Sequence, residues 1–446
     1  METIAAYLQR KSREIALLNA CLNTPLPLPQ PNSPAEVIKQ KFQLASALKA
    51  EYAIQDWALT ETAWAHRGMV KAGPFEFSYD YQRADLEVQG PSFYAFSDPE
   101  AHDTIYTSSG MSALSALLFA SAKLWPSADI MVLPGSYGET LELIEAHIHH
   151  LRTVQLDDPV EDLAAGGGRS RILLLDTSTV CRGIEAALHW TSPMIDLVVF
   201  DTTCFASGSG RIGRVLNWAR RCRLPIVLVR SHTKLDSLGL EYGRLGSAIF
   251  IGAKRQVRTR EQDLVRILAN GMRQAVRLFG GAALPAHFSP FVGKSDYRAL
   301  TDGRVASILR NSRRTARYFR QALGGSSAQS HFTHGLYLTL VPRRAVNEAG
   351  ARQLAADLSA DLGKAGMPLR HAGSFGFDFG AIEWFHETLS DRYLVRIAVP
   401  DLPTLLWDEV ARAIAAWWSA REKASPAANQ PSPPGRRRPA GRTMIG

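Results

Sequence analysis

The sequence has few cysteines and no long apolar run. Its four cysteines are scattered without a CxxC spacing, so neither a disulfide framework nor a zinc knuckle is predicted. No apolar run reaches the roughly 18 residues that a membrane span needs. The first 23 residues interleave charges with apolar positions instead of building the core of a signal peptide. We therefore expect a cytoplasmic protein that does not cross a membrane.

Acidic residues are absent from the last stretch of the chain, residues 424–446. This stretch contributes four of the arginines behind the formal charge of +9, and without them the charge is about +5, an ordinary value for this size. Its proline, alanine and serine content cannot bury a core, so we expect a disordered basic tail. The overall charge therefore does not predict binding to nucleic acid.

Hydrophobic residues make up 46% of the 446 residues, which is ample for one large domain and a smaller one. A helix is predicted up to about Asn23, before the five prolines of residues 24–34, and a helix or helix pair from Ala35 to about His66. The expected divisions are an arm with helices (1–65), a large domain (66–292), a small C-terminal domain (293–423) and the tail (424–446).

Short apolar runs alternate with amphipathic helical patterns between about Thr104 and Phe250. The runs are DIMVLPG, RILLLDT, LVVFDTT, PIVLVRS and SAIFIG. Strands buried on both faces have this composition, and helical crossovers between them imply a mainly parallel sheet. The predicted fold class is α/β: a three-layer αβα domain with a mainly parallel sheet, followed by a smaller C-terminal α+β domain. Functional side chains are expected just past the carboxyl ends of the strands.

A lysine follows the apolar run PIVLVRS, in the segment SHTK. At the mouth of the sheet, Lys234 can form a Schiff base with an aldehyde cofactor, and the hydroxyls of Ser231 and Thr233 can bond a phosphate. Asp201 ends the run before it, where a carboxylate can pair with a protonated pyridine nitrogen. Taken alone, Lys234 could simply be a solvated lysine, and Asp201 could be an aspartate that caps a turn. Together they favour pyridoxal 5′-phosphate as the cofactor.

Three further segments carry candidate ligands. Ser109 and Gly110 begin a helix rich in small residues, where backbone N–H groups suit a phosphate, although a plain serine cap has the same pattern. Tyr137 stands on a glycine-flanked turn, from which its ring could stack on a cofactor. Arg396 lies within an apolar strand, where it needs a carboxylate ligand or an acidic partner, unless it faces solvent from an edge strand.

The order of these segments resembles the fold-type I pyridoxal-phosphate enzymes, and within them the cysteine and methionine metabolism (trans-sulfuration) family, with its aspartate-aminotransferase-like large domain. The similar segments, spread over about residues 75–400, are YDYQR, SSGM, PGSYGET, VVFDTT, SHTK, AGSFGFD and LVRIAV. The resemblance implies catalytic roles for Lys234, Tyr137 and Asp201. It implies cofactor contacts for Ser109, Gly110, Met111, Tyr137, Asp201, Thr203, Ser231, Thr233, Lys234, Tyr81 and Arg83, and substrate contacts for Arg396 and Ser374.

In that family the YDYQR-like segment reaches the phosphate of the neighbouring subunit. The resemblance therefore implies that Tyr81 and Arg83 act across an interface, in a homodimer or homotetramer with its sites between subunits. It also implies β- or γ-elimination or replacement on an α-amino acid substrate, with the carbanion formed beside Lys234. An aminotransferase is the alternative. Val180 stands where the family has an asparagine, which identifies a divergent member.

Other interpretations rest on less specific patterns. The segment GSGRIG at 208–213 fits the dinucleotide pattern, and Arg230 with Ser231 could bind a 2′-phosphate, as in an NADP-dependent reductase. The histidines at 147, 149 and 150 could suggest a metal, but their spacing and the lack of carboxylate partners favour a solvated helix end. A non-catalytic binding module is the third alternative, which the joint presence of Lys234, Asp201 and Arg396 disfavours.

Overall fold

The computed structural model describes most of the chain. The described residues are 2–53, 64–81, 84, 86–95, 102–156, 168–176, 184, 188–190, 194–252, 260–324, 328–330, 336–387 and 390–424. Arg83, Val180 and nearly all of the predicted tail lie outside them. Among the described helices, none has both the length and the apolarity needed to cross a membrane.

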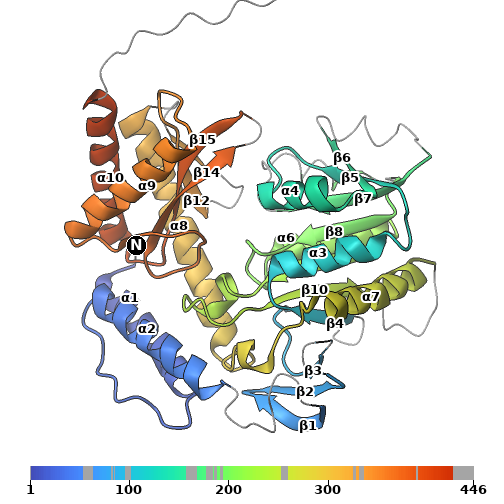
Figure 1. The fold of residues 1–446 in the computed structure, drawn as a ribbon. Helices are drawn as coiled ribbons and strands as arrows, with labels where there is room; N and C mark the ends of the chain where they lie inside the picture. The colour runs from blue at the N-terminus through green and yellow to red at the C-terminus, as the bar shows by residue number, and fades with distance from the viewer. Residues whose placement is uncertain are drawn as a thin grey trace, which may run out of the picture.

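A seven-stranded sheet forms the centre of the larger half of the molecule (Figure 1). Its strands are β4 (His102–Thr107), β5 (Ala128–Val132), β6 (Leu151–Gln155), β7 (Ser170–Leu175), β8 (Leu197–Asp201), β9 (Ile226–Ser231) and β10 (Gly246–Ile251). In the order β4-β10-β9-β8-β7-β5-β6, only β10 runs antiparallel to its neighbours. The predicted mainly parallel sheet is confirmed.

Side chains that alternate along each strand build two separate cores. In β8, Val199 packs in the core that α3 (Gly110–Ser121), α4 (Gly138–His147) and α7 (Arg260–Phe279) cover. Val198 points the other way, into the core shared with α6 (Gly210–Arg221). Helices therefore cover both faces of the sheet, as Figure 1 shows, and the three-layer αβα arrangement is confirmed.

The C-terminal part has its own sheet and core. Its strands are β11 (Ala328–Ser330), β12 (Tyr337–Leu340), β13 (Leu369–His371), β14 (Gly380–Glu387) and β15 (Arg392–Ala398), in the order β11-β12-β15-β14-β13. Its helices are α8 (Tyr297–Leu323), α9 (Glu348–Lys364) and α10 (Thr404–Ala424). The strand that carries Arg396 lies between β12 and β14, so the edge-strand interpretation of this arginine is wrong.

The N-terminal part contributes two helices and a small sheet. The helices are α1 (Ile4–Asn19) and α2 (Pro34–Glu51), and the sheet contains β1 (Ala65–Ala72), β2 (Phe75–Tyr79) and β3 (Glu87–Gln89). Short 3₁₀ helices, η3 (Leu235–Ser237) and η4 (Pro285–His287), lie in later loops. The predicted extension of helix to His66 is wrong, because Ala65 already pairs with Tyr79 in an antiparallel ladder and strand pairing overrides the local helix pattern.

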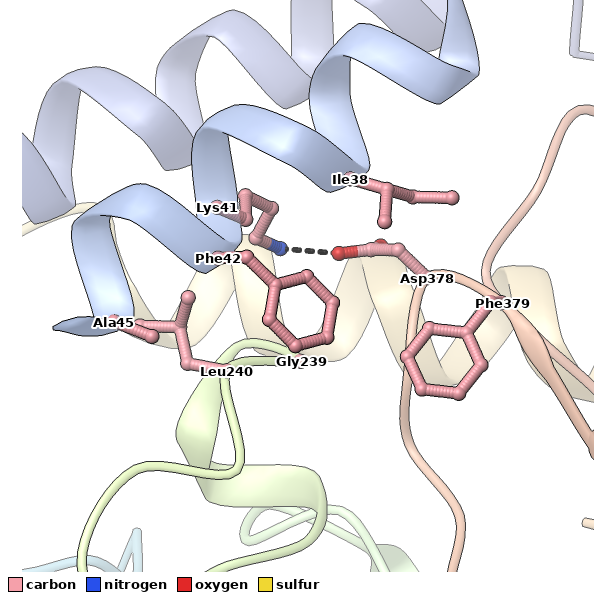
Figure 2. Close-up of a pocket in the computed structure, with 8 residues that line it drawn as sticks. All are labelled: Ile38, Lys41, Phe42, Ala45, Gly239, Leu240, Asp378 and Phe379. Carbon is pink, nitrogen blue, oxygen red and sulfur yellow. Dashed lines mark ion pairs between the residues drawn. The ribbon is translucent and has the colours of Figure 1, made fainter. Parts of the chain in front are cut away.

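A buried ionic cluster joins α1 and α2 to the C-terminal part. It contains three cations and three carboxylates: Lys11, Lys41, Arg304, Glu14, Asp378 and Asp401. Lys41 Nζ lies 2.6 Å from Glu14 Oε2 and 2.6 Å from Asp378 Oδ2, and Figure 2 shows the second of these pairs. Lys41 also donates to the carbonyl of Leu238, and Arg304 Nη2 donates to that of Gly376 at 2.7 Å. The cluster therefore fixes two loops that meet at Lys234.

Lys41→Met tests the cluster. Removing this cation leaves Glu14 and Asp378 buried without full compensation, so we expect the free energy of unfolding to fall by about 3–5 kcal/mol. Urea denaturation measures it. Lys39→Met, at an exposed position of the same helix, is the matched control and should change little. Equal effects of the two substitutions would contradict the role of the cluster.

Candidate active site

The ends of β8 and β9 bring four predicted residues together. The Thr203 N–H donates to Asp201 Oδ1 at 2.8 Å, and the Ser231 N–H donates to the Thr203 hydroxyl at 3.0 Å. The hydroxyls of Ser231 and Thr233 are 3.0 Å apart. Adjacent parallel strands end at the same edge of a sheet, which is why segments 28 residues apart meet here.

The start of α3 lies against the same hydroxyls. Ser109 is its N-cap and accepts from the Ser112 N–H at 3.0 Å, so the ordinary cap interpretation of this serine is correct. A Cβ at Gly110 would lie 3.0 Å from the Ser231 Cβ, and one at Gly246 would collide with the Ser109 backbone at 2.2 Å. These glycines let the positive end of the α3 dipole, with Met111 in its first turn, approach the end of β9.

Lys234 follows β9 with its amine unoccupied by the described residues. Its Nζ lies 4.8 Å above the ring of Phe375 and makes no hydrogen bond or ion pair with any described residue. Gly376 has φ +93°, and a Cβ there would lie 3.1 Å from the Lys234 carbonyl oxygen. The turn that bears Lys234 is thus held by backbone contact, whereas its amine is available for chemistry.

Asp201 and Lys234 are close enough to interact through their charges. Burial raises the pKa of Asp201, while hydrogen bonds from Thr203 and the positive charge of Lys234 act in the opposite direction. Because burial penalises the charged carboxylate, a further cation or N–H donor bound beside it would be stabilising.

A buried ion pair between Arg230 and Asp236 fixes the turn that carries Lys234. The sequence did not predict this pair. The buried Arg230 donates to both oxygens of Asp236, each at 2.6 Å, and its Nη1 donates to the carbonyls of Thr202 and Phe205 at 2.7 and 2.8 Å. His232 Nδ1 lies 2.8 Å from Asp236 Oδ2. All of these donors point into the protein, so the interpretation of Arg230 as a 2′-phosphate ligand is wrong.

Tyr137 lies at the start of α4, on the side of the sheet edge nearest the C-terminal strands. Its N–H donates to Asp176 Oδ2 at 2.7 Å, at the end of β7. Burial raises the pKa of Tyr137, and the charges of Arg396 and Glu383 also act on its hydroxyl. Asp176 ends the run RILLLD, and its place directly after β7 was a signal that could have identified it.

Arg396 has the acidic partner that its place in an apolar strand requires. Its Nε donates to Glu383 Oε1 at 2.8 Å, across the β14–β15 ladder in which the two residues are direct partners. Nearby, Ser374 has φ +86°, in the left-handed region that serine rarely adopts. Residues 373–376 therefore form a strained turn between Arg396 and Lys234.

Of the two cofactor contacts predicted from the YDYQR segment, the structure describes only Tyr81. Tyr81 follows β2, with its ring centroid 6.3 Å from that of Trp64. Arg83, and Val180 at the position of the family asparagine, lie outside the described residues. A role across a subunit interface is therefore still a prediction.

The competing motifs have no structural support in the described residues. A Cβ at Gly208, Gly210 or Gly213 would meet open space, so these glycines are not needed for a close backbone approach. Among the described residues no cluster of histidine, cysteine and acidic side chains could hold a metal. His150 Nε2 instead pairs with the Ser121 hydroxyl at 2.9 Å.

No family model and no curated protein matches the sequence. Solved structures do match in fold. A cystathionine gamma synthase from Xanthomonas oryzae pv. oryzae, in complex with cystathionine, is 17% identical over 84% of this chain and 98% of its own, with a TM-score of 0.49.

Two others are more distant. A putative O-acetylhomoserine (thiol)-lyase from Campylobacter jejuni, which carries a pyridoxyl-lysine monophosphate, is 12% identical over 72% of this chain and 82% of its own, with a TM-score of 0.48. A serine palmitoyltransferase from Sphingomonas wittichii is 12% identical over 72% of this chain and 73% of its own, with a TM-score of 0.47. At such identities and TM-scores the likeness carries no argument about the reaction.

Asp236→Asn tests the ion pair through acid unfolding. Burial alone would raise the pKa of Asp236, but Arg230 and His232 lower it to about 2, against about 3.9 in an unfolded chain. Its stabilising effect is therefore complete above about pH 4 and is lost as the pH falls through about 2. In urea denaturation, the difference in free energy of unfolding between wild type and variant should shrink as the pH falls from about 4 to about 2. A constant gap between about pH 5 and about pH 2.5 would contradict the assignment.

Proposed function

We propose that this chain is a pyridoxal 5′-phosphate-dependent enzyme that acts on an α-amino acid. The observation that carries the proposal is the meeting of three groups at one sheet edge. They are Asp201 after β8, the amine of Lys234 after β9, which pairs with no described residue, and the start of α3 beside Ser231 and Thr233. When bound, this cofactor supplies an aldehyde that links covalently to amines and a ring that withdraws electrons from the α-carbon.

The donor set fits each part of the cofactor. The first turn of α3 and the hydroxyls of Ser231 and Thr233 suit the phosphate dianion. Asp201 suits the pyridine nitrogen, because a protonated nitrogen would compensate a carboxylate whose charged form is penalised by burial. Lys234 is the residue for covalent attachment, since its amine has no competing partner among the described residues.

The remaining residues act on the substrate. The amine of Lys234 would remove the proton from the α-carbon, and Asp201 would keep the ring nitrogen protonated. Arg396 offers its guanidinium to the substrate carboxylate. Tyr137, on whose hydroxyl the charges of Arg396 and Glu383 act, would stack on the cofactor and assist the leaving group. The reaction proposed is β- or γ-elimination or replacement, in a homodimer or larger homo-oligomer to which Tyr81 and Arg83 contribute across the interface.

Lys234→Ala tests the covalent attachment. The purified wild type, incubated with pyridoxal 5′-phosphate, should be yellow, and borohydride followed by peptide mass spectrometry should find the cofactor on Lys234. The variant should lose this reducible linkage completely, whereas Lys294→Ala, at an exposed position, should keep it. Wild-type protein that binds NADPH and no pyridoxal 5′-phosphate would refute the proposal.

Asp201→Asn separates attachment from catalysis. The variant should still carry the reducible linkage, because Lys234 is intact, but α-proton removal should slow by about 10²-fold or more without the charge that stabilises the protonated ring. Keto-acid release from amino acids with sulfur, halogen or acyl leaving groups measures turnover. Asp196 immediately precedes β8, at the end of the strand opposite to Asp201. Asp196→Asn is therefore the control and should retain the wild-type rate.

A further inference from the structure

The guanidinium of Arg396 already has a carboxylate beside it. Glu383 Oε1 lies 2.8 Å from Arg396 Nε, and the two side chains keep 15% and 16% of their surface exposed. The pair is therefore not sealed in the core, as the charges of the ionic cluster around Lys11 are, and a ligand can reach both of its members.

Neighbouring rings limit where that ligand can bind. The rings of Tyr337 and Phe385 lie 4.6 and 5.1 Å from the Arg396 guanidinium carbon. The Nη edge of the guanidinium makes no hydrogen bond with a described residue, so it is the edge left for a carboxylate. On the other side, a Cβ at Gly373 would lie 2.9 Å from Glu383 Oε2, so the glycine leaves room for this second carboxylate oxygen.

The pair stands close to the proposed chemistry. The ring of Tyr337, which lies over Arg396, also meets the ring of Phe375 edge-on at 5.4 Å. Phe375 in turn lies under the Lys234 amine. The positive edge of Arg396 and the negative edge of Glu383 therefore lie side by side. Both are within the reach of one side chain from Lys234, the residue proposed to hold the cofactor.

We infer that Glu383 determines specificity, and that the substrate is an α-amino acid with a second, positively charged group in its side chain. This inference rests on the proposed function. The substrate carboxylate binds the Nη edge of Arg396, and its distal cation binds Glu383 Oε2. The charges of Arg396 and Glu383 already cancel, so a substrate whose only charged contact is its carboxylate gains little and is repelled by Glu383. A diamino acid matches both the Nη edge of Arg396 and the carboxylate of Glu383.

L-Lysine and its uncharged analogue L-norleucine are the probes. The wild-type holoenzyme is titrated with each, and binding is measured by the change in the cofactor absorbance and by calorimetry. We expect lysine to bind at least about tenfold more tightly than norleucine, the ratio that one modest ion pair supplies. In Glu383→Gln this preference should disappear, with norleucine binding more tightly than it does to the wild type.

Glu387→Gln, on the same strand β14, is the matched control and should keep the wild-type preference. Circular dichroism establishes that both variants fold. If the holoenzyme forms but the wild type does not prefer lysine, or Glu383→Gln keeps the preference, Glu383 only orients Arg396 and the inference is wrong. If no holoenzyme forms and Lys234 carries no reducible linkage, the proposed function itself has failed.

Discussion

The candidate site depends on the ion pair between Arg230 and Asp236. One guanidinium closes the turn that carries Lys234 and, through the carbonyls of Thr202 and Phe205, binds the segment that follows Asp201. Two catalytic candidates that are 33 positions apart are therefore held by one buried cation. Without it, the turn that carries Lys234 would lose its buried link to the segment after Asp201.

The larger half of the molecule could be predicted well from sequence. The five apolar runs became β5, β7, β8, β9 and β10, because strands buried on both faces need continuous apolar residues. The missed strands β4 and β6 lie at the sheet edges, and their polar sequences HDTIYT and LRTVQ lack that signal. The reversed direction of β10 was not predictable either, since direction depends on a connection and not on composition.

The site was predictable only where its residues follow strands. Asp201, Ser231 and Lys234 share that position, and the structure brings them together. The pairing of Arg396 with Glu383 was missed because β14 was not predicted, and a ladder partner cannot be named before its strand is known. Arg230 was misread because it adjoins functional residues, although alternation along β9 turns its side chain to the opposite face from that of Ser231.

The ionic cluster also constrains the order of events during synthesis. Lys11 pairs with Asp378 and Asp401, which are made 367 and 390 residues later. At ribosomal speed this delay is roughly 20–80 s. Throughout that time Lys11 can pair with Glu14 of its own helix, but its two aspartate partners do not yet exist. The contacts that join Lys11 to the C-terminal part therefore form only after that part has been synthesised.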